Sequence, residues 1–144
     1  MRTTLLIGEL AARSGRSVHA IRWYDAQGLI PGVVRDGGGR RVFTERHVDW
    51  LALLDRLRST GMSVADIRRY AALVGQGRAG VPGQHELLAA HRTRVAIALA
   101  EWQAALELLD GKLAFYKEWL ATGERPAIEV RKSATMRSAP KRRR

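Results

Sequence analysis

The stretch RDGGGRRVF, from Arg35 to Phe43, places three consecutive glycines directly before two arginines, Arg40 and Arg41. Glycine has no side chain that would keep another molecule away from the backbone. An arginine guanidinium is permanently charged and forms paired hydrogen bonds with phosphate or carboxylate oxygens. The stretch therefore predicts a tight loop that approaches an anionic partner, and a structural hairpin with solvated arginines is the alternative.

Side chains that usually carry catalysis or hold metals are sparse in this sequence. Its 144 residues include no cysteine, so a disulfide, a thiolate metal site and a cysteine nucleophile are excluded. No serine–histidine–aspartate arrangement, carboxylate pair or phosphate-binding loop stands out. The histidines are scattered without metal-ligand spacing, at His19, His47, His85 and His91. We therefore expect no metal, no cofactor and no enzymatic activity.

One glycine motif invites a nucleotide-binding interpretation. GQGRAG, from Gly75 to Gly80, matches the G-x-G-x-x-G pattern literally. A dinucleotide site requires a strand before the first glycine and a helix at the last one. Because helical periodicity precedes Gly75, we interpret residues 76–83 as a glycine-rich hinge instead.

The charge of the chain is concentrated at its two ends. Residues 1–75 hold twelve basic and seven acidic side chains, residues 76–124 hold five and six, and residues 125–144 hold eight and one. Basic ends suit contact with a polyanion, and a nearly neutral middle suits contact with protein. No apolar run approaches the roughly 20 residues that span a bilayer, and no secretory segment is present. We expect a cytoplasmic protein without membrane contact.

The first elements are two short helices. A helix is predicted from Ile7 to Arg13, and Ser17 suits the N-cap of a second helix that runs to about Gln27. Only residues 15–17 separate the two, which is the spacing of a helix-turn-helix. On the second helix, Val18 and Ile21 face the core and leave a polar, basic face exposed.

A hairpin and two further helices follow. Residues 33–35 and 40–43 flank the glycine turn as two short strands. Thr44 can cap a helix with an apolar stripe at Val48, Leu51, Leu54 and Leu57, and Ser63 can cap the next helix. Residues 1–75 thus form one mainly helical domain in which the glycine loop is a wing beside the helix-turn-helix.

A long helix is predicted from residue 84 to residue 121. From Leu99 onward its large apolar side chains alternate in steps of three and four, which is the pattern of a coiled-coil seam. A second copy of the chain is the expected cover for this seam, and folding back onto the chain's own domain is the alternative. Residues 122–144 form a basic tail that we expect to be disordered. The seam consists of Leu99, Trp102, Leu106, Leu109, Leu113, Tyr116 and Leu120.

The combination of a helix-turn-helix, a basic hairpin and a dimer helix predicts a DNA-binding protein. A helix of this diameter fits the major groove, where His19 or Arg22 can contact base edges or phosphates. A wing tipped with glycines lets Arg40 and Arg41 reach the neighbouring backbone or minor groove. An adaptor protein, whose coiled coil binds another protein and whose basic surface is incidental, is a rival interpretation.

The segments IGELAARSGRSVHAIRWYDAQGLIP, GRRVFTERHVDWL and LRSTGMSVADIRRYAAL resemble the winged-helix DNA-binding domain of MerR-type transcriptional regulators. The resemblance covers about residues 5–75, and the long helix is similar to the antiparallel coiled-coil dimer helix of that family. HELLAAHR and LLDGKLAFY look most like the subgroup of aldehyde- and stress-responsive regulators. The candidate DNA contacts that follow are Ser17, His19, Arg22 and Tyr24 on the recognition helix and Arg40 and Arg41 on the wing.

The chain departs from the family pattern at several of these positions. His19 and Ala20 stand where arginine and threonine are frequent, Trp23 replaces the first of two tyrosines, and Arg40 replaces a common wing tyrosine. These departures bear on the operator sequence rather than on binding itself. The resemblance implies a homodimer on a two-fold promoter site, which it bends and untwists so that RNA polymerase can use a long spacer. An architectural or excisionase-like DNA-bending protein is the alternative.

The resemblance leaves the inducer open. Metal- and redox-sensing members of the family, and several aldehyde-responsive ones, use cysteines, which this chain lacks. A small-molecule pocket near the aromatic residues of the long helix is conceivable, but aromatics at helical spacing fit a dimer core better. A regulator without an inducer is therefore a second possibility. The aromatic residues concerned are Trp102, Phe115, Tyr116 and Trp119.

Overall fold

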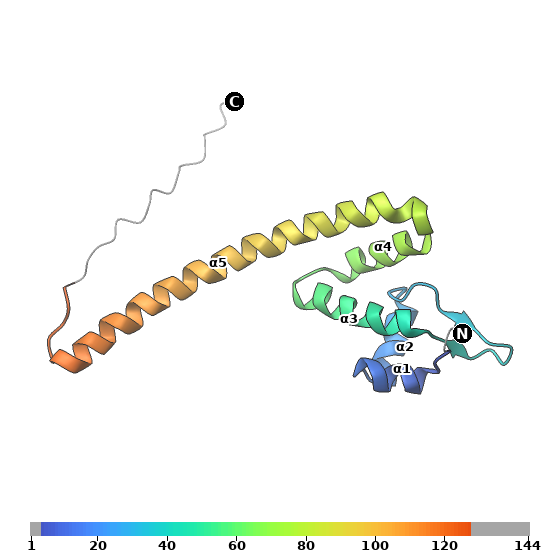
Figure 1. Ribbon diagram of the computed structural model, residues 1–144, viewed down its shortest axis with the longest axis horizontal. Coiled ribbons are helices and arrows are strands. Elements are labelled where there is room, and N and C mark those ends of the chain that lie inside the picture. Colours follow the sequence, from blue (N-terminus) through green and yellow to red (C-terminus); the bar gives the residue numbers. More distant parts are fainter. Residues whose placement is uncertain (1–3, 128–144) are drawn as a thin grey trace, which may run out of the picture. The chain divides into compact units, whose positions relative to one another are not determined.

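The computed structural model describes residues 4–127 of the chain. In chain order its elements are α1 (Ile7–Ser14), α2 (Val18–Ala26), β1 (Val34–Arg35), β2 (Arg41–Val42), α3 (Glu45–Ser59), α4 (Val64–Gly75), the 3-10 helix η1 (Gly77–Gly80) and α5 (Val81–Thr122). Figure 1 shows this mainly helical fold, which confirms the expected winged helix-turn-helix followed by a long helix. The chain divides into two compact units, and the boundary between them follows Ala100. Most of the predicted basic tail, residues 128–144, lies outside the described residues.

Local interactions fix the ends of the helix-turn-helix. Helix α1 ends because Gly15 adopts a left-handed φ of 67°, which glycine reaches without steric cost. Two residues later, the Ser17 hydroxyl accepts a hydrogen bond from the Ala20 backbone N–H at 3.1 Å and caps α2. Gly28, with a φ of 72°, turns the chain after α2. The boundaries predicted for both helices are thus confirmed to within a residue or two.

The core of the first unit draws on α1 to α4 and the start of α5. Trp50 on α3 stacks on Tyr70 of α4 with ring centroids 5.3 Å apart, and its indole N–H donates to the Leu29 carbonyl at 2.8 Å. Each large apolar side chain that is fully buried contributes about 1.5–3 kcal/mol. This core therefore joins α3 to α4 and to the segment that follows α2. Its largest fully buried side chains are Phe43, Leu10, Ile21, Leu29, Leu51, Leu54 and Ile67.

A buried histidine ties the loop after α2 to the start of α3. The Nδ1 atom of His47 accepts a hydrogen bond from the Thr44 backbone N–H at 2.9 Å. The Nε2 atom then donates to the Pro31 carbonyl, 3.1 Å away. Burial lowers the pKa of His47 below its ordinary value, because the charged ring would lose its hydration. The ring is therefore neutral at pH 7 and serves as a structural link.

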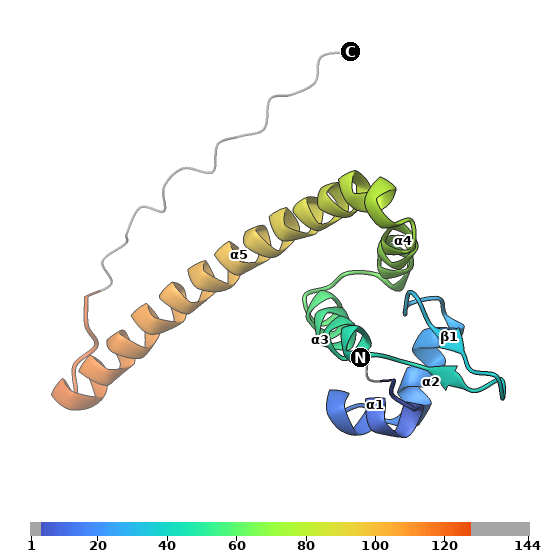
Figure 2. The same ribbon diagram turned by 45° about the vertical axis from the view of Figure 1, so that its right-hand side comes forward.

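The wing is a very short hairpin. Val34 pairs with Val42 and Arg35 with Arg41, in antiparallel register. A bridge between Leu5 and Phe43 attaches the base of the hairpin to the segment before α1. In Figures 1 and 2 the hairpin extends away from α1, α2 and α3, so its tip is open to a partner.

The connector after α4 differs from the expected hinge. Residues 77–80 form η1, and α5 begins at Val81 rather than at residue 84. Gly80 is buried, and a Cβ atom at this position would lie 1.9 Å from the Leu73 carbonyl oxygen. The Gln84 side-chain amide donates to the same carbonyl at 3.2 Å. The glycine here allows close packing, and the segment expected as a hinge instead consists of η1 and, from Val81 onward, the first residues of α5.

Helix α5 spans 42 residues and carries the predicted seam. In the single chain, the seven seam side chains are exposed, from 51% for Tyr116 to 87% for Leu120. Only Leu87 and His91, near the start of α5, are buried among its described side chains. Across residues 4–127, no helix has a stretch long and apolar enough to cross a membrane.

Candidate nucleic-acid interface

Helix α2 presents a polar face to solvent. His19 and Arg22, three residues apart, are both exposed, whereas Ile21 is fully buried. Ser17 is also exposed, but its hydroxyl already accepts the hydrogen bond that caps the helix. Two of the side chains proposed for the recognition helix are thus available to a partner, and Ser17 fixes the start of the helix that carries them.

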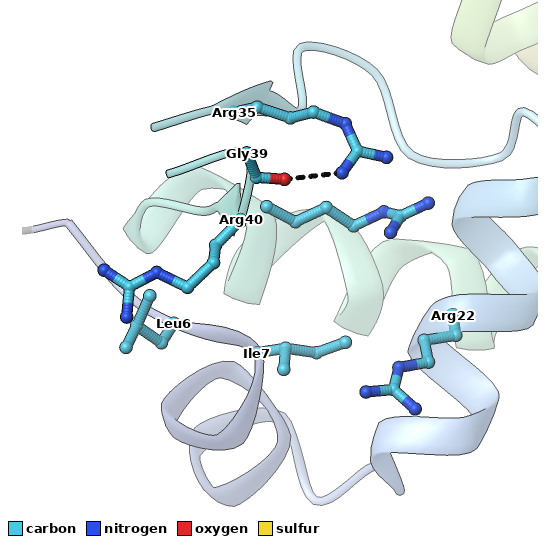
Figure 3. A pocket seen from close by; sticks show the side chains of 7 residues that line it. Leu6, Ile7, Arg22, Arg35, Gly39 and Arg40 are labelled. Atoms are coloured by element: carbon cyan, nitrogen blue, oxygen red, sulfur yellow. Dashed lines mark hydrogen bonds between the residues drawn. The ribbon is translucent and has the colours of Figure 1, made fainter. Parts of the chain in front are cut away.

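An open, basic hollow of about 330 Å³ lies between α2 and the wing. Arg22 approaches it from α2, and Arg35, Arg40 and Arg41 approach it from the hairpin. In Figure 3 the guanidinium of Arg22 extends towards Ile7, and Arg40 extends on the side of Leu6. None of the seven residues that line the hollow is acidic, so the site favours an anion. Its lining is Leu6, Ile7, Arg22, Arg35, Gly39, Arg40 and Arg41.

The wing tip is organised around one carboxylate. Asp36 Oδ1 accepts hydrogen bonds from the backbone N–H groups of Gly38 at 3.0 Å and Arg40 at 2.9 Å. Its Oδ2 accepts from Arg40 Nε at 3.0 Å, while Arg35 donates to the Gly39 carbonyl at 2.7 Å. The Arg40 backbone N–H is the largest cause that lowers the pKa of Asp36. These contacts preorganise the turn, and Arg40 is held in place before any partner arrives.

Arg41 is engaged differently from Arg40. Its Nε forms an ion pair with Asp25 on α2, sixteen residues away in sequence. The Asp25 side chain is only 17% exposed, so this pair is partly shielded from solvent. Arg41 therefore joins the wing to the recognition helix and still lines the hollow.

Tyr24 occupies a position that the sequence did not predict. Its side chain is 4% exposed, so it offers little surface for the direct contact expected of it. Its hydroxyl oxygen accepts hydrogen bonds from Arg16 at 2.9 Å and from Arg58 at 3.2 Å. The guanidinium of Arg58 also lies 5.9 Å from the ring centre of Trp23. The Tyr24 hydroxyl thus joins two guanidinium groups, those of Arg16 and Arg58.

Arg16, Arg35 and Arg58 are functional candidates that the sequence reasoning missed. Arg58 is exposed at the end of α3, whereas Arg16 is partly buried and pairs with Asp55. Tyr24 and Arg58 are 34 residues apart, so no local spacing signals their contact. The spacing of Ile21 and Tyr24 was a usable signal, because residues three apart on a helix share a face and Ile21 was expected in the core.

The histidines do not form a metal site in the part of the chain that the structure describes. No group of three or more histidine, aspartate or glutamate side chains is placed there to hold an ion. His47 and His91 are buried and His19 is exposed on α2. His91 has its own structural contact, with Nε2 lying 2.8 Å from the Thr60 hydroxyl.

Comparison with known proteins adds an independent line of evidence. The model of a family described as MerR HTH family regulatory protein matches residues 5–73. An uncharacterized HTH-type transcriptional regulator of Haemophilus influenzae is 36% identical over 127 residues, which are 88% of this chain and 94% of the relative.

Two solved structures extend the likeness to the long helix. HiNmlR, a MerR family regulator lacking the sensor domain and solved bound to promoter DNA, is 37% identical with a TM-score of 0.71, over 85% of this chain and 97% of that one. A putative MerR family regulator from Listeria monocytogenes is 31% identical with a TM-score of 0.76, over 83% and 90% of the two chains. The chain therefore belongs to the MerR family of helix-turn-helix transcriptional regulators.

Proposed function

We propose that this protein regulates transcription by binding promoter DNA, with α2 in the major groove and the wing on the neighbouring backbone. The observation that carries the proposal is the hollow between α2 and the wing, which four arginines and no acidic residue line. Duplex DNA carries about one negative charge per 1.7 Å of its axis, so a backbone phosphate matches this hollow.

The exposed groups divide into two roles. In this proposal His19 and Arg22, which are exposed on α2, contact base edges or nearby phosphates. Arg40, which lines the hollow from the wing, contacts the backbone in this proposal and so sets the position of α2 in the groove. Arg58, on α3, donates to the Tyr24 hydroxyl and offers a further phosphate contact. Base contacts from α2 supply specificity and the arginines supply affinity.

The seam on α5 supports a homodimer. Its seven large apolar side chains are exposed in the single chain, and burying each one contributes about 1.5–3 kcal/mol. Their gross contribution is on the order of 10 kcal/mol before ordering costs. An antiparallel coiled coil with a second copy places two recognition helices on one duplex, which suits a two-fold symmetric operator.

The relationship to the MerR family supports a promoter-remodelling mechanism. HiNmlR was solved bound to promoter DNA and lacks the sensor domain. By analogy, we propose that two wings and two recognition helices grip one promoter and stabilise it in a bent and untwisted form. RNA polymerase then uses the realigned promoter elements. The same fold without promoter control, as an architectural DNA-bending protein, is the alternative.

A paired comparison of variants tests the DNA-binding role. The probe is a duplex that the wild-type protein selects from random sequence, and binding is followed by fluorescence anisotropy at moderate salt. We expect the double change Arg22→Ala and Arg41→Ala to weaken binding at least about tenfold, since it removes two groups that line the hollow.

The control is the double change Arg78→Ala and Arg92→Ala, which removes the same charge from exposed positions on η1 and α5. Its affinity should stay within about threefold of wild type, because a charge outside the interface adds only a small long-range attraction. Equal losses in both double variants would favour an incidental basic surface, as in the adaptor interpretation.

A further inference from the structure

The wing makes few polar contacts with the helices, although its base is anchored by Val33, which packs against the core, and by the bridge between Leu5 and Phe43. Each of its strands contains two residues, and a hairpin of this size is only marginally stable by itself. Within residues 33–42, the hydrogen bonds of Asp36, Arg35 and Arg40 remain inside the hairpin. Among the described residues, the pair of Arg41 with Asp25 is the only polar side-chain contact between this segment and a helix.

The position of Asp25 is costly in two respects. It lies in the last turn of α2 (Val18–Ala26), where the helix dipole disfavours a negative charge. It also places a carboxylate against Arg41, which is one of the four arginines that line a hollow suited to phosphate. By charge alone, Asp25 should weaken both α2 and the binding of DNA. Any favourable contribution of Asp25 must therefore come from its pair with Arg41.

We propose that Asp25 is a positioning residue for DNA recognition, which acts through Arg41 to fix the wing relative to the recognition helix. This inference rests on the proposed DNA-binding function. The partly buried carboxylate draws the Arg41 side chain onto α2 and thereby sets the separation between the groove contacts of α2 and the backbone contacts of the wing. Without it, the two contact surfaces bind DNA with a variable spacing.

The predicted effect is opposite in sign to simple electrostatics. Asp25→Asn removes a negative charge near the hollow, which by itself would strengthen attraction to DNA. Positioning predicts the reverse on the selected duplex, with about tenfold weaker binding. On random-sequence DNA, where spacing matters less, affinity should be unchanged or slightly higher. The readout is therefore the ratio of the affinity for the selected duplex to the affinity for random-sequence DNA. Positioning predicts that Asp25→Asn lowers this ratio, whereas the loss of charge alone would not lower it.

A double-mutant cycle tests whether Asp25 affects DNA affinity through Arg41. If Asp25 acts through Arg41, then adding Asp25→Asn to an Arg41→Ala protein should change the affinity less than about twofold. Asp49→Asn is the matched control, because Asp49 is exposed on α3 and its removal changes the net charge equally. That control should bind the selected duplex as tightly as wild type or slightly more tightly.

The absence of cysteine allows a direct test of wing position. Gly37→Cys on the wing and Ala12→Cys on α1 introduce two spin labels, and Gly37 is suitable because a Cβ atom there meets nothing within 4 Å. Pulsed electron resonance should give a narrow distance distribution with Asp25 present and a broader one after Asp25→Asn. Circular dichroism confirms that each variant is folded.

The outcomes separate the inference from the function on which it rests. If wild type selects no duplex, the proposed function fails. If wild type binds its duplex and Asp25→Asn binds it equally well or better, the positioning role is wrong. Additive losses in the double-mutant cycle, or an unchanged distance distribution in a folded Asp25→Asn protein, would overturn it as well.

Discussion

At the scale of single residues, Tyr24 links the core to the DNA-binding surface. Its partly buried hydroxyl accepts two guanidinium hydrogen bonds, from Arg16 and Arg58. Tyr24→Phe keeps the ring and removes the acceptor, so the arginines should lose their fixed positions. We expect about three- to tenfold weaker DNA binding, with the loss of stability limited to about 1–3 kcal/mol. Anisotropy and urea unfolding measure the two effects.

Tyr70 provides the matched control for this change. Burial raises the pKa of Tyr70, and its ring stacks on Trp50 away from the arginine hollow. Tyr70→Phe should therefore leave DNA affinity unchanged. A Tyr24→Phe protein that binds as tightly as the Tyr70→Phe protein would show that the arginines do not depend on the hydroxyl.

His47 should make folding stability depend on pH. Its folded pKa is lowered by burial, so the unfolded chain binds more protons than the folded chain just below the ordinary pKa of about 6.5. The contribution of the neutral ring is complete above pH 6.5 and is lost as the pH falls towards the folded pKa. Urea unfolding at pH 7.5 and pH 5.5 should show this decline.

A His47→Asn variant isolates that contribution from the other histidines. The amide oxygen can still accept from Thr44, but the amide does not titrate. The variant should be less stable than wild type at pH 7.5 and should lose less stability on acidification. An identical decline in both proteins would place the titrating group elsewhere.

At the scale of elements, the junction between α4 and α5 is a packed structure. Gly80→Ala would place a Cβ atom 1.9 Å from the Leu73 carbonyl oxygen, so the backbone must move. We expect a loss of several kcal/mol in the free energy of unfolding. Gly111→Ala, inside α5, meets nothing within 4 Å and should stabilise the helix by about 1 kcal/mol. Opposite shifts in the urea midpoint would support this account, and equal shifts would contradict it.

The elements themselves could largely be predicted from local signals. Ser17 as a cap is read directly from a short sequence pattern and acts as expected, and α1 ends at Ser14, one residue after the predicted end at Arg13. The segment between α4 and α5 was predicted as a hinge because glycine is common both in flexible segments and where two parts of the backbone pack closely. The contact of Gly80 with the Leu73 carbonyl, which favours close packing, cannot be read from the sequence. The pair of Asp25 with Arg41 was missed for a similar reason, since it joins residues sixteen positions apart across two elements.

At the scale of the whole molecule, dimerisation determines whether two recognition helices act together. Leu106 and Leu113 lie on the exposed seam of α5, so Leu106→Glu or Leu113→Glu would place a charge where an apolar contact is proposed. Each variant should reduce the mass measured by light scattering to that of one chain. Gln103→Glu, at an exposed position off the seam, should leave the dimer intact. A seam variant that keeps twice the chain mass would contradict this interface.

The most direct test of the central claim is a genome-wide binding selection with the purified protein, followed by a footprint on the best site. Our account predicts a two-fold symmetric footprint between the two elements of a promoter with a long spacer, with protection from both recognition helices and both wings. Binding without sequence preference, or at sites unrelated to promoters, would contradict promoter regulation and favour an architectural DNA-bending protein with the same winged helix.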